Sequence, residues 1–300
     1  MKVGFVGVGT MGEPMAANLL AAGFDVTVVA HTSRERVERL LTKGATEAAT
    51  IAEVAGGVDV LVTCVPNDVA VEAVMLGPEG VAKGGREGLV VVDTSTIAPS
   101  TSKRVADELA AQGISMLDAP ISGGETGAIA GTLAIMVGGP QEAYEKALPV
   151  LEAMGKNITY IGGNGTALVV KLCNNLIVAV GSCAVSEALT MAAVAGIDTG
   201  VVQGVLSNAT SRSWIIEDKL PRSLLVGNVQ PGFKLALMRK DAGLALDCGK
   251  ELGVPMFVTA LVHQLYSQAL GQGKGDLDCI GVAELYTEAT GVSLESHLDD

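Results

Sequence analysis

The chain opens with Lys2-Val-Gly-Phe-Val-Gly7-Val8-Gly9-Thr10-Met11-Gly12, an apolar run followed by three glycines spaced G-x-G-x-x-G. Between a strand and a helix, Gly7 makes a tight turn, Gly9 lets the backbone approach a pyrophosphate, and Gly12 lets the helix pack closely on the strand. Free N–H groups at the helix start then face the diphosphate. The stretch Gly7–Gly12 is therefore predicted to bind a dinucleotide, and an ordinary strand-to-helix turn is the alternative.

The residues that follow alternate β-branched runs with amphipathic stretches, which is typical of βαβ units in a parallel sheet. Strands are expected at residues 2–6, 26–29, 58–65, 88–93, 115–118, 133–137 and 158–161, and helices at 11–22, 34–42 and 101–112. Beyond residue 161 the periodicity is helical, with breaks near Gly196, 227–231, 253–255 and 271–275. The sequence predicts an α/β domain with a mostly parallel Rossmann-type sheet over residues 1–163 and an all-helical domain over residues 164–300.

Composition narrows the class of protein further. The 300 residues are 49% hydrophobic and 3% aromatic and include 38 glycines, which favours an α/β protein rich in small aliphatic side chains. The formal net charge of −13 repels phosphate backbones and anionic lipids, so nucleic acids and membranes are not expected as partners. Five cysteines without a C-x-x-C pair indicate neither a disulfide framework nor a metal site, and they favour the reducing cytoplasm.

The end of the second predicted strand bears on the choice of dinucleotide. An Asp or Glu there would bind the ribose 2′-OH of NAD, but the sequence runs Val28-Val-Ala-His31-Thr32-Ser-Arg34 without an acid. His31, Thr32 and Arg34 could surround a 2′-phosphate, with Arg34 supplying a charge-assisted contact. NADP is therefore predicted in preference to NAD, the alternative being that Arg34 begins a solvated helix.

A second glycine-rich turn follows a predicted strand at Asp118-Ala-Pro-Ile-Ser122-Gly123-Gly124. Its N–H groups can converge on an anion, and the Ser122 hydroxyl lies beside them. A substrate carboxylate would fit this turn, although Gly-Gly turns without a ligand are common.

The richest apolar stretch, residues 167–195, contains Lys171, Asn174, Asn175 and Glu187. So many polar groups disfavour a membrane span and favour a long buried helix. The i, i+3, i+4 spacing places Lys171, Asn174 and Asn175 on one helix face. If Lys171 lines a polar cavity, burial disfavours its ammonium form and makes a free amine available as a general base; otherwise it extends to solvent.

Two further cationic positions are ambiguous. Lys240, in Arg239-Lys240-Asp241, could reach cofactor or substrate, and Arg212, in Ser211-Arg212-Ser213-Trp214, could bind a second substrate carboxylate. Solvated surface cations would give the same pattern.

Taken together, these motifs resemble the 3-hydroxyacid dehydrogenase family, which includes 3-hydroxyisobutyrate, tartronate semialdehyde and 2-(hydroxymethyl)glutarate dehydrogenases. The resemblance spans nearly the whole chain. It rests on Gly4 to Gly12, Val65-Pro66-Asn67, Asp93 to Thr96, Asp118 to Gly124 with Gly131-Thr-Leu133, Gly165 to Asn175, and Lys240-Asp241.

The resemblance implies that Lys171 is the catalytic acid/base and that Asn175 orients the substrate and this lysine. It further implies a carboxylate site at Ser122, Gly123 and Gly124. Residues expected to line the cofactor are Val65, Pro66, Asn67, Thr96 and Lys240. His31 stands where NAD-using members place an acid. The family fold has a long interdomain helix and a helical domain that builds a homo-oligomer, a dimer or a tetramer.

The expected activity is hydride transfer between a nicotinamide dinucleotide and a small 3-hydroxy carboxylate or its semialdehyde. An inactive relative that binds proteins and a nucleotide-sensing module are the alternatives, because fold alone does not fix function. The presence of Lys171, Asn175 and Ser122 together argues against both.

Overall fold

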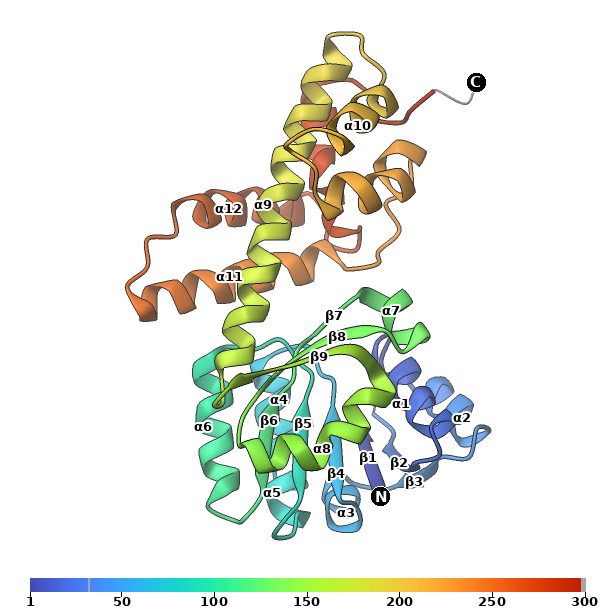
Figure 1. Ribbon diagram of the computed structural model, residues 1–300, viewed down its shortest axis with the longest axis vertical. Coiled ribbons are helices and arrows are strands. Elements are labelled where there is room, and N and C mark those ends of the chain that lie inside the picture. Colours follow the sequence, from blue (N-terminus) through green and yellow to red (C-terminus); the bar gives the residue numbers. More distant parts are fainter. Residues whose placement is uncertain (32, 298–300) are drawn as a thin grey trace. The chain divides into compact units, whose positions relative to one another are not determined.

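A computed structural model of the chain describes residues 1–31 and 33–297, so Thr32 lies outside the described residues. Two compact units make up the structure, Met1–Lys171 and the part from Leu172 onward (Figure 1). The first unit carries the sheet and the second is helical. The division falls inside a continuous helix, α9 (Thr166–Val194), eight residues beyond the boundary expected between residues 163 and 164.

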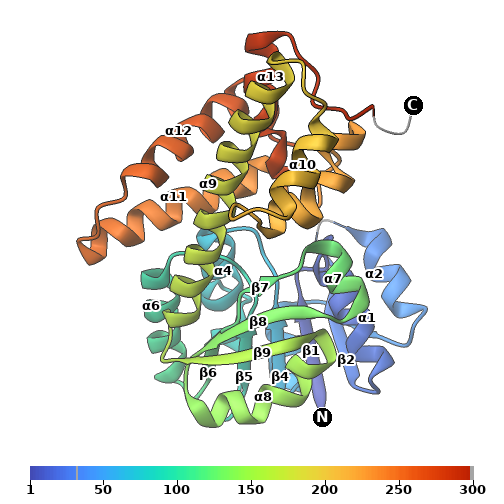
Figure 2. The ribbon, with the colours of Figure 1, turned by 45° about the horizontal axis from the view of Figure 1, so that its top comes forward.

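The sheet of the first unit has the strand order β3-β2-β1-β4-β5-β6-β8-β7, with β9 paired to β8. Its strands are β1 (Lys2–Val6), β2 (Asp25–Val29), β3 (Thr46–Ala48), β4 (Val60–Thr63), β5 (Val90–Asp93), β6 (Ser115–Asp118), β7 (Ile121–Ser122), β8 (Leu133–Gly138) and β9 (Gly155–Gly162). The pairs β6–β8 and β7–β8 are antiparallel and the other pairs are parallel. Figure 2 shows β7, β8 and β9 side by side. The prediction of a mostly parallel sheet is confirmed.

Helices cover both faces of this sheet. They are α1 (Gly12–Ala21), α2 (Arg34–Leu41), α3 (Ile51–Gly57), α4 (Asp68–Leu76), α5 (Val81–Gly84), α6 (Pro99–Ala110), α7 (Gly124–Ala130) and α8 (Gln141–Met154). Alternate residues of each central strand enter two separate cores: Val62 and Val92 pack on one face, and Leu61 and Val91 on the other. Burial on both faces explains why strands such as Val90-Val-Val read as continuous apolar runs.

The carboxyl ends of the strands form one row across the sheet. Asp93 is in register with Thr63 on one side and with Asp118 on the other. Asp118 in turn pairs with Gly138, and Gly138 pairs with Gly162. Ligands of open α/β sheets bind beyond this edge, so the row underlies the expected site.

The second unit is built from helices. It contains most of α9, with α10 (Thr199–Ser207), α11 (Leu235–Leu252), α12 (Phe257–Gly271), α13 (Glu284–Thr290), and the short helical turns Ile215–Lys219, Leu220–Arg222, Leu224–Val226 and Cys279–Ala283. By length and composition α9 could cross a membrane, but 44% of its most apolar window is buried within the fold. A core helix passes the same test, and Ile177 and Met191 on α9 remain exposed.

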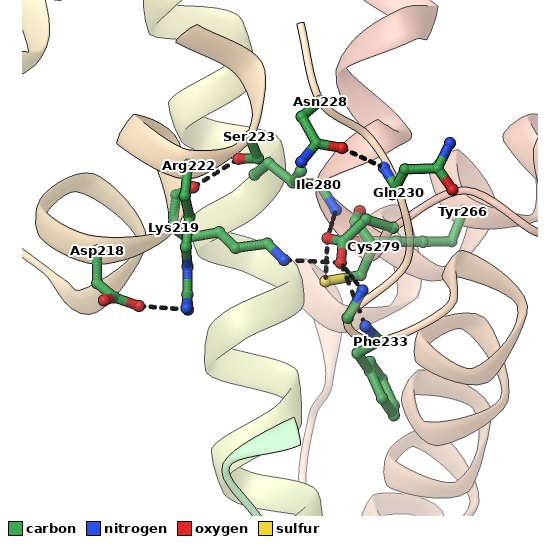
Figure 3. A network of polar contacts seen from close by, with 12 residues as sticks. Asp218, Lys219, Arg222, Ser223, Asn228, Gln230, Phe233, Tyr266, Cys279 and Ile280 are labelled. Atoms are coloured by element: carbon green, nitrogen blue, oxygen red, sulfur yellow. Dashed lines mark hydrogen bonds and ion pairs between the residues drawn. The ribbon is translucent and has the colours of Figure 1, made fainter. Parts of the chain in front are cut away.

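A buried ion pair organises the segment that leads into α11 (Figure 3). Lys219 Nζ lies 2.7 Å from Asp278 Oδ2, and the same oxygen accepts the N–H groups of Gly232 at 2.8 Å and Phe233 at 3.2 Å. Burial opposes the charge of Asp278, but Lys219 and these backbone donors outweigh it, so the pKa of Asp278 is lowered. The start of the helix that carries Lys240 is thereby fixed.

Candidate active site

The glycine-rich turn after β1 has the geometry that a pyrophosphate needs. Gly7 has φ +95°, and a Cβ on it would lie 2.2 Å from the Cys64 carbonyl oxygen. A Cβ on Gly12, the first residue of α1, would lie 2.1 Å from the Gly7 oxygen. Gly9 differs, because its Cβ position has no heavy atom within 4 Å. Gly7 and Gly12 therefore have no room for a side chain, whereas the space beside Gly9 is open, which fits the predicted dinucleotide.

The loop after β4 forms the next part of the predicted cofactor site. Asn67 caps α4, its Oδ1 accepting the Ala70 N–H at 2.9 Å. Val65 N donates to Ser95 Oγ at 2.9 Å, which ties this loop to the loop after β5. Pro66 and Asn67 are exposed, and Thr96 is half-buried at the end of the neighbouring strand.

Asp93, at the end of β5, links these two loops through buried hydrogen bonds. Its Oδ1 accepts the hydroxyls of Ser95 at 2.6 Å and Thr63 at 2.8 Å, and all three residues are buried. Because Ser95 then accepts from Val65, the hydrogen bonds run from the sheet interior to the cofactor loop. Sequence reasoning noted Asp93 as part of a family motif and assigned it no role.

Two of the residues predicted to surround a 2′-phosphate, His31 and Arg34, are described at the end of β2. His31 is exposed. Arg34 begins α2 and forms ion pairs with Glu38 at 3.1 Å and Glu47 at 2.5 Å, so its charge is already matched by two carboxylates. These carboxylates raise the pKa of Arg34, Glu47 first.

Arg36, which sequence reasoning did not select, lies closer to the glycine-rich turn. Its NH2 is 3.4 Å from Thr10 Oγ1, and its NH1 is 3.5 Å from Glu13 Oε2. Arg39 binds the same carboxylate at 2.6 Å, and these arginines lower the pKa of Glu13, Arg39 most strongly. Arg36 is two residues beyond Arg34, so the two side chains lie on different faces of α2.

The predicted carboxylate turn joins β7 to α7. Ser122 ends β7, and Gly123 and Gly124 have φ values of +133° and +62°. Side chains other than hydrogen rarely adopt these values, so the two glycines are required by the backbone path. A Cβ on Gly123 would also lie 3.2 Å from Leu133 Cδ2.

The polar face of α9 spans the end of the first unit and the start of the second. Lys171 is the last residue of the first unit and is 6% exposed, and Asn175, one helical turn later, is 5% exposed. Asn174 Nδ2 donates to Asn175 Oδ1 at 2.9 Å, and Asn175 Nδ2 donates to Asp241 Oδ2 at 2.6 Å. The amide of Asn175 is therefore held at both ends.

Asp241 is the partner that sequence reasoning missed. It is 2% exposed, lies on α11, and its Oδ1 is 3.1 Å from Lys240 Nζ. An ionised carboxylate only accepts hydrogen bonds, so Asp241 fixes which end of the Asn175 amide faces it. In the sequence, the only indication of a role for Asp241 was its position next to Lys240, a predicted site residue.

The Arg212 side chain is 72% exposed, and its Nε is 3.7 Å from Glu217 Oε1. Such an exposed ion pair contributes little to stability. Among the residues that the structure describes, no group of three or more His, Cys, Asp or Glu side chains is placed to hold a metal ion.

The five cysteines, all of which the structure describes, form no disulfide with one another, and Cys173 on α9 is exposed. Burial raises the pKa of Cys64 to about 11 and that of Cys183 to about 12.

Comparison with known proteins places these features in a family. Residues 2–162 match the family described as the NAD binding domain of 6-phosphogluconate dehydrogenase, and residues 163–286 match the one described as NAD-binding of NADP-dependent 3-hydroxyisobutyrate dehydrogenase. The 2-(hydroxymethyl)glutarate dehydrogenase of Eubacterium barkeri is 38% identical over 98% of this chain and 97% of its own length. The chain belongs to the 3-hydroxyacid dehydrogenase family.

Further relatives agree with this assignment. The 2-hydroxy-3-oxopropionate reductase of Escherichia coli (strain K12) is 40% identical over 93% of this chain and 94% of its own. A structure of Mycobacterium tuberculosis 3-hydroxyisobutyrate dehydrogenase with L-serine has a TM-score of 0.87 at 31% identity and covers 95% of this chain and 98% of that one. The predicted family, fold and class of nicotinamide-dependent oxidoreductase are confirmed, and the alternative of an inactive relative finds no support.

Proposed function

We propose that this 3-hydroxyacid dehydrogenase interconverts a small 3-hydroxy carboxylate and its semialdehyde, with Lys171 as general acid/base. The observation that carries the proposal is the polar face of α9, where buried Lys171 and Asn175 lie one turn apart and Asp241 fixes the Asn175 amide. Lysine is almost never fully buried unless it is paired, and asparagine is mostly exposed, so both side chains are unusual here. The named activities of the relatives from Eubacterium barkeri and Escherichia coli support the substrate class.

Each residue then has a distinct part in the chemistry. The N–H groups and hydroxyl of the Ser122–Gly124 turn hold the substrate carboxylate. The Lys171 amine takes the hydroxyl proton during oxidation, and its ammonium returns the proton during reduction. The glycine-rich turn Gly7–Gly12 would hold the pyrophosphate of a nicotinamide dinucleotide, whose nicotinamide ring would supply the hydride chemistry at the carbinol carbon.

Asn175 has one amide hydrogen left for the substrate. Its Oδ1 accepts from Asn174 and one of its N–H groups donates to Asp241. The second N–H can donate to the reacting oxygen, which fixes the orientation of that oxygen toward Lys171.

A panel of 3-hydroxyacids and semialdehydes, assayed by nicotinamide absorbance with NAD and with NADP, tests the proposal. We expect turnover of at least one 3-hydroxy carboxylate and none of its 2-hydroxy isomer. Tight cofactor binding without turnover across the whole panel would contradict a catalytic function.

We further propose that NADP is preferred over NAD. No acid follows β2, and two arginines, Arg34 and Arg36, begin α2. Since Arg34 is matched by Glu38 and Glu47, Arg36 beside Thr10 is the stronger candidate for a contact with the 2′-phosphate. A charge-assisted hydrogen bond of this kind contributes about 1.5–3 kcal/mol.

Arg36→Met is accordingly expected to raise the dissociation constant for NADP by about tenfold to a hundredfold and to leave that for NAD nearly unchanged. Arg34→Met should have the smaller effect. Arg39→Met, which also loses a contact with Glu13, is the matched control. Calorimetric titration of the wild type and the variants with NAD and with NADP measures these dissociation constants. A wild-type preference for NAD would refute the proposal.

A homo-oligomer formed through the helical unit is proposed from its exposed apolar side chains. Between the end of α11 and the second turn of α12, five large apolar residues are at least half exposed: Leu252, Val254, Phe257, Val258 and Leu261. Contiguous patches of this kind mark interaction surfaces. Phe257, at 83% exposed, is expected to be central, so Phe257→Glu should shift the molar mass measured by light scattering toward the monomer. An unchanged mass would place the contact elsewhere.

A cytoplasmic location is proposed because the five cysteines, all within the described residues, form no disulfide, as is usual in a reducing compartment. Fractionation of cells that produce the protein, followed by immunoblotting, tests it; recovery outside the soluble cytoplasmic fraction would contradict it.

A further inference from the structure

The long helix α9 begins without a side-chain cap of its own. The residue before it is Gly165, which has φ +84° and no side chain to accept a hydrogen bond. The hydroxyl of Thr166 turns back and donates to the Gly163 carbonyl at 2.7 Å. The first N–H groups of a helix have no partners within the helix, so another part of the chain has to supply them.

Asp118 supplies the missing acceptor from the end of β6. Its Oδ1 accepts the Gly165 N–H at 2.8 Å, directly before the first turn of α9. The side chain of Asn164 strengthens the same attachment, donating to the Met116 carbonyl at 2.7 Å and to Asp118 Oδ1 at 3.4 Å. Two residues of β6 therefore bind the start of a helix 47 positions further along the chain.

Glycines leave the room that this attachment needs. A Cβ on Gly138, the register partner of Asp118, would lie 2.7 Å from Asp118 Oδ2 and 2.9 Å from the Gly163 oxygen. A Cβ on Gly165 would lie 2.8 Å from Lys103 Cε and 3.0 Å from the Pro99 oxygen at the start of α6. The start of α9 is thus enclosed by β6, β8 and α6.

Burial of the Asp118 carboxylate is unfavourable in free energy. Asp118 is 1% exposed, and burial raises its pKa to about 6, although the hydrogen bonds from Gly165 and Asn164 oppose the rise. Its Oδ2 has no hydrogen-bond partner among the residues that the structure describes. A retained charge under such conditions points to a use beyond packing.

We propose that Asp118 is a positioning residue for the reaction, which sets the place of Lys171 with respect to the Ser122–Gly124 turn. The inference rests on the proposed function of those residues. Ser122 follows Asp118 by four residues along the main chain. The Asp118 side chain binds the N–H of Gly165, which is six residues before Lys171. At 1.5 Å per helical residue the lysine lies roughly 9 Å along a rigid helix from that contact.

The expected consequence concerns the rate rather than cofactor binding. Without the carboxylate the first turn of α9 frays and Lys171 shifts, and a misplacement of about 1 Å can cost about a hundredfold in rate. We therefore expect Asp118→Ala to lower kcat by about a hundredfold while the dissociation constant of the cofactor stays unchanged. Asp118→Asn keeps an acceptor for Gly165 and should restore most of kcat, and Gly138→Ala, which presses on Asp118, should lower it.

Hydrogen exchange of the amides at residues 165–171 gives a readout that does not depend on activity. Exchange there should accelerate in Asp118→Ala and return toward the wild-type rate in Asp118→Asn. If the wild type turned over no hydroxyacid, the proposed function would fail while this part of the inference would still be decided by exchange.

The matched control is Asp198→Ala. Asp198 also accepts N–H groups at a helix start, as the N-cap residue of α10: its Oδ1 accepts the Gly200 N–H at 2.7 Å and the Val201 N–H at 3.3 Å, and no predicted site residue lies on α10. This variant should lose stability and keep its kcat. The inference is overturned if Asp118→Ala keeps a wild-type kcat, if Asp118→Asn is as slow as Asp118→Ala, or if Asp198→Ala slows catalysis equally.

Discussion

Replacing Lys171 with methionine is expected to lower kcat by about 10²–10⁴-fold, the usual contribution of a general acid/base. Methionine keeps an unbranched apolar stem of similar length, so the packing of α9 around this 6% exposed residue should survive. Because Lys171 is proposed to act on the substrate proton, the dissociation constant of the cofactor should not change. The measurement is kcat at saturating substrate, together with a cofactor titration.

Cys173→Ser provides the control, since Cys173 lies on the same helix and is exposed. It should retain the wild-type rate. If the Lys171 variant kept more than about a tenth of wild-type activity, a loss below the usual range for such groups, another residue would have to be the acid/base.

The second large effect is expected at the carboxylate turn, where Gly123→Val should raise KM for the hydroxyacid by about tenfold to a hundredfold. Valine at φ +133° is strained, and strain of about 1–3 kcal/mol moves the N–H groups that are proposed to hold the carboxylate. The side chain also approaches Leu133 at the 3.2 Å Cβ distance. Steady-state kinetics with the substrate identified by the panel measures the change.

Two comparisons make this result specific. Gly44→Val carries similar strain at φ +100° with open space around the Cβ position, so it reports the cost of strain away from the turn. The amide of the substrate lacks the carboxylate, so the wild type should use it poorly. Equal use of acid and amide by the wild type would show that no carboxylate site exists.

Local patterns were sufficient to predict much of the fold. The G-x-G-x-x-G stretch, the buried run predicted at residues 88–93 and the breaks at Gly253 and Gly271 all matched observed element boundaries within a few residues. Elements that were missed have weak local signals: β3 is three residues long and mostly exposed, and α7 is short and rich in glycine and alanine. Helix α8 contains Pro149, which normally disfavours a helix interior.

The site was predictable as a set of residue types and not as a set of contacts. The spacing of Lys171, Asn174 and Asn175 placed them on one helix face, because periodicity is a local property. The pairing of Asn175 with Asp241 joins residues 66 positions apart, and no local pattern encodes it. Likewise, no local pattern in the sequence shows that Glu47, on a separate strand, binds Arg34.

The exposure of Cys173 gives this chain a natural attachment point for probes. Cys183, Cys248 and Cys279 are buried, and Cys64 is a partly buried thiol of raised pKa, so at neutral pH a maleimide dye meets one accessible thiol. That thiol lies two residues from Lys171 on the same helix. A fluorophore there would label the helix that carries Lys171, on a face turned about 200° away from that lysine, with no cysteine introduced or removed.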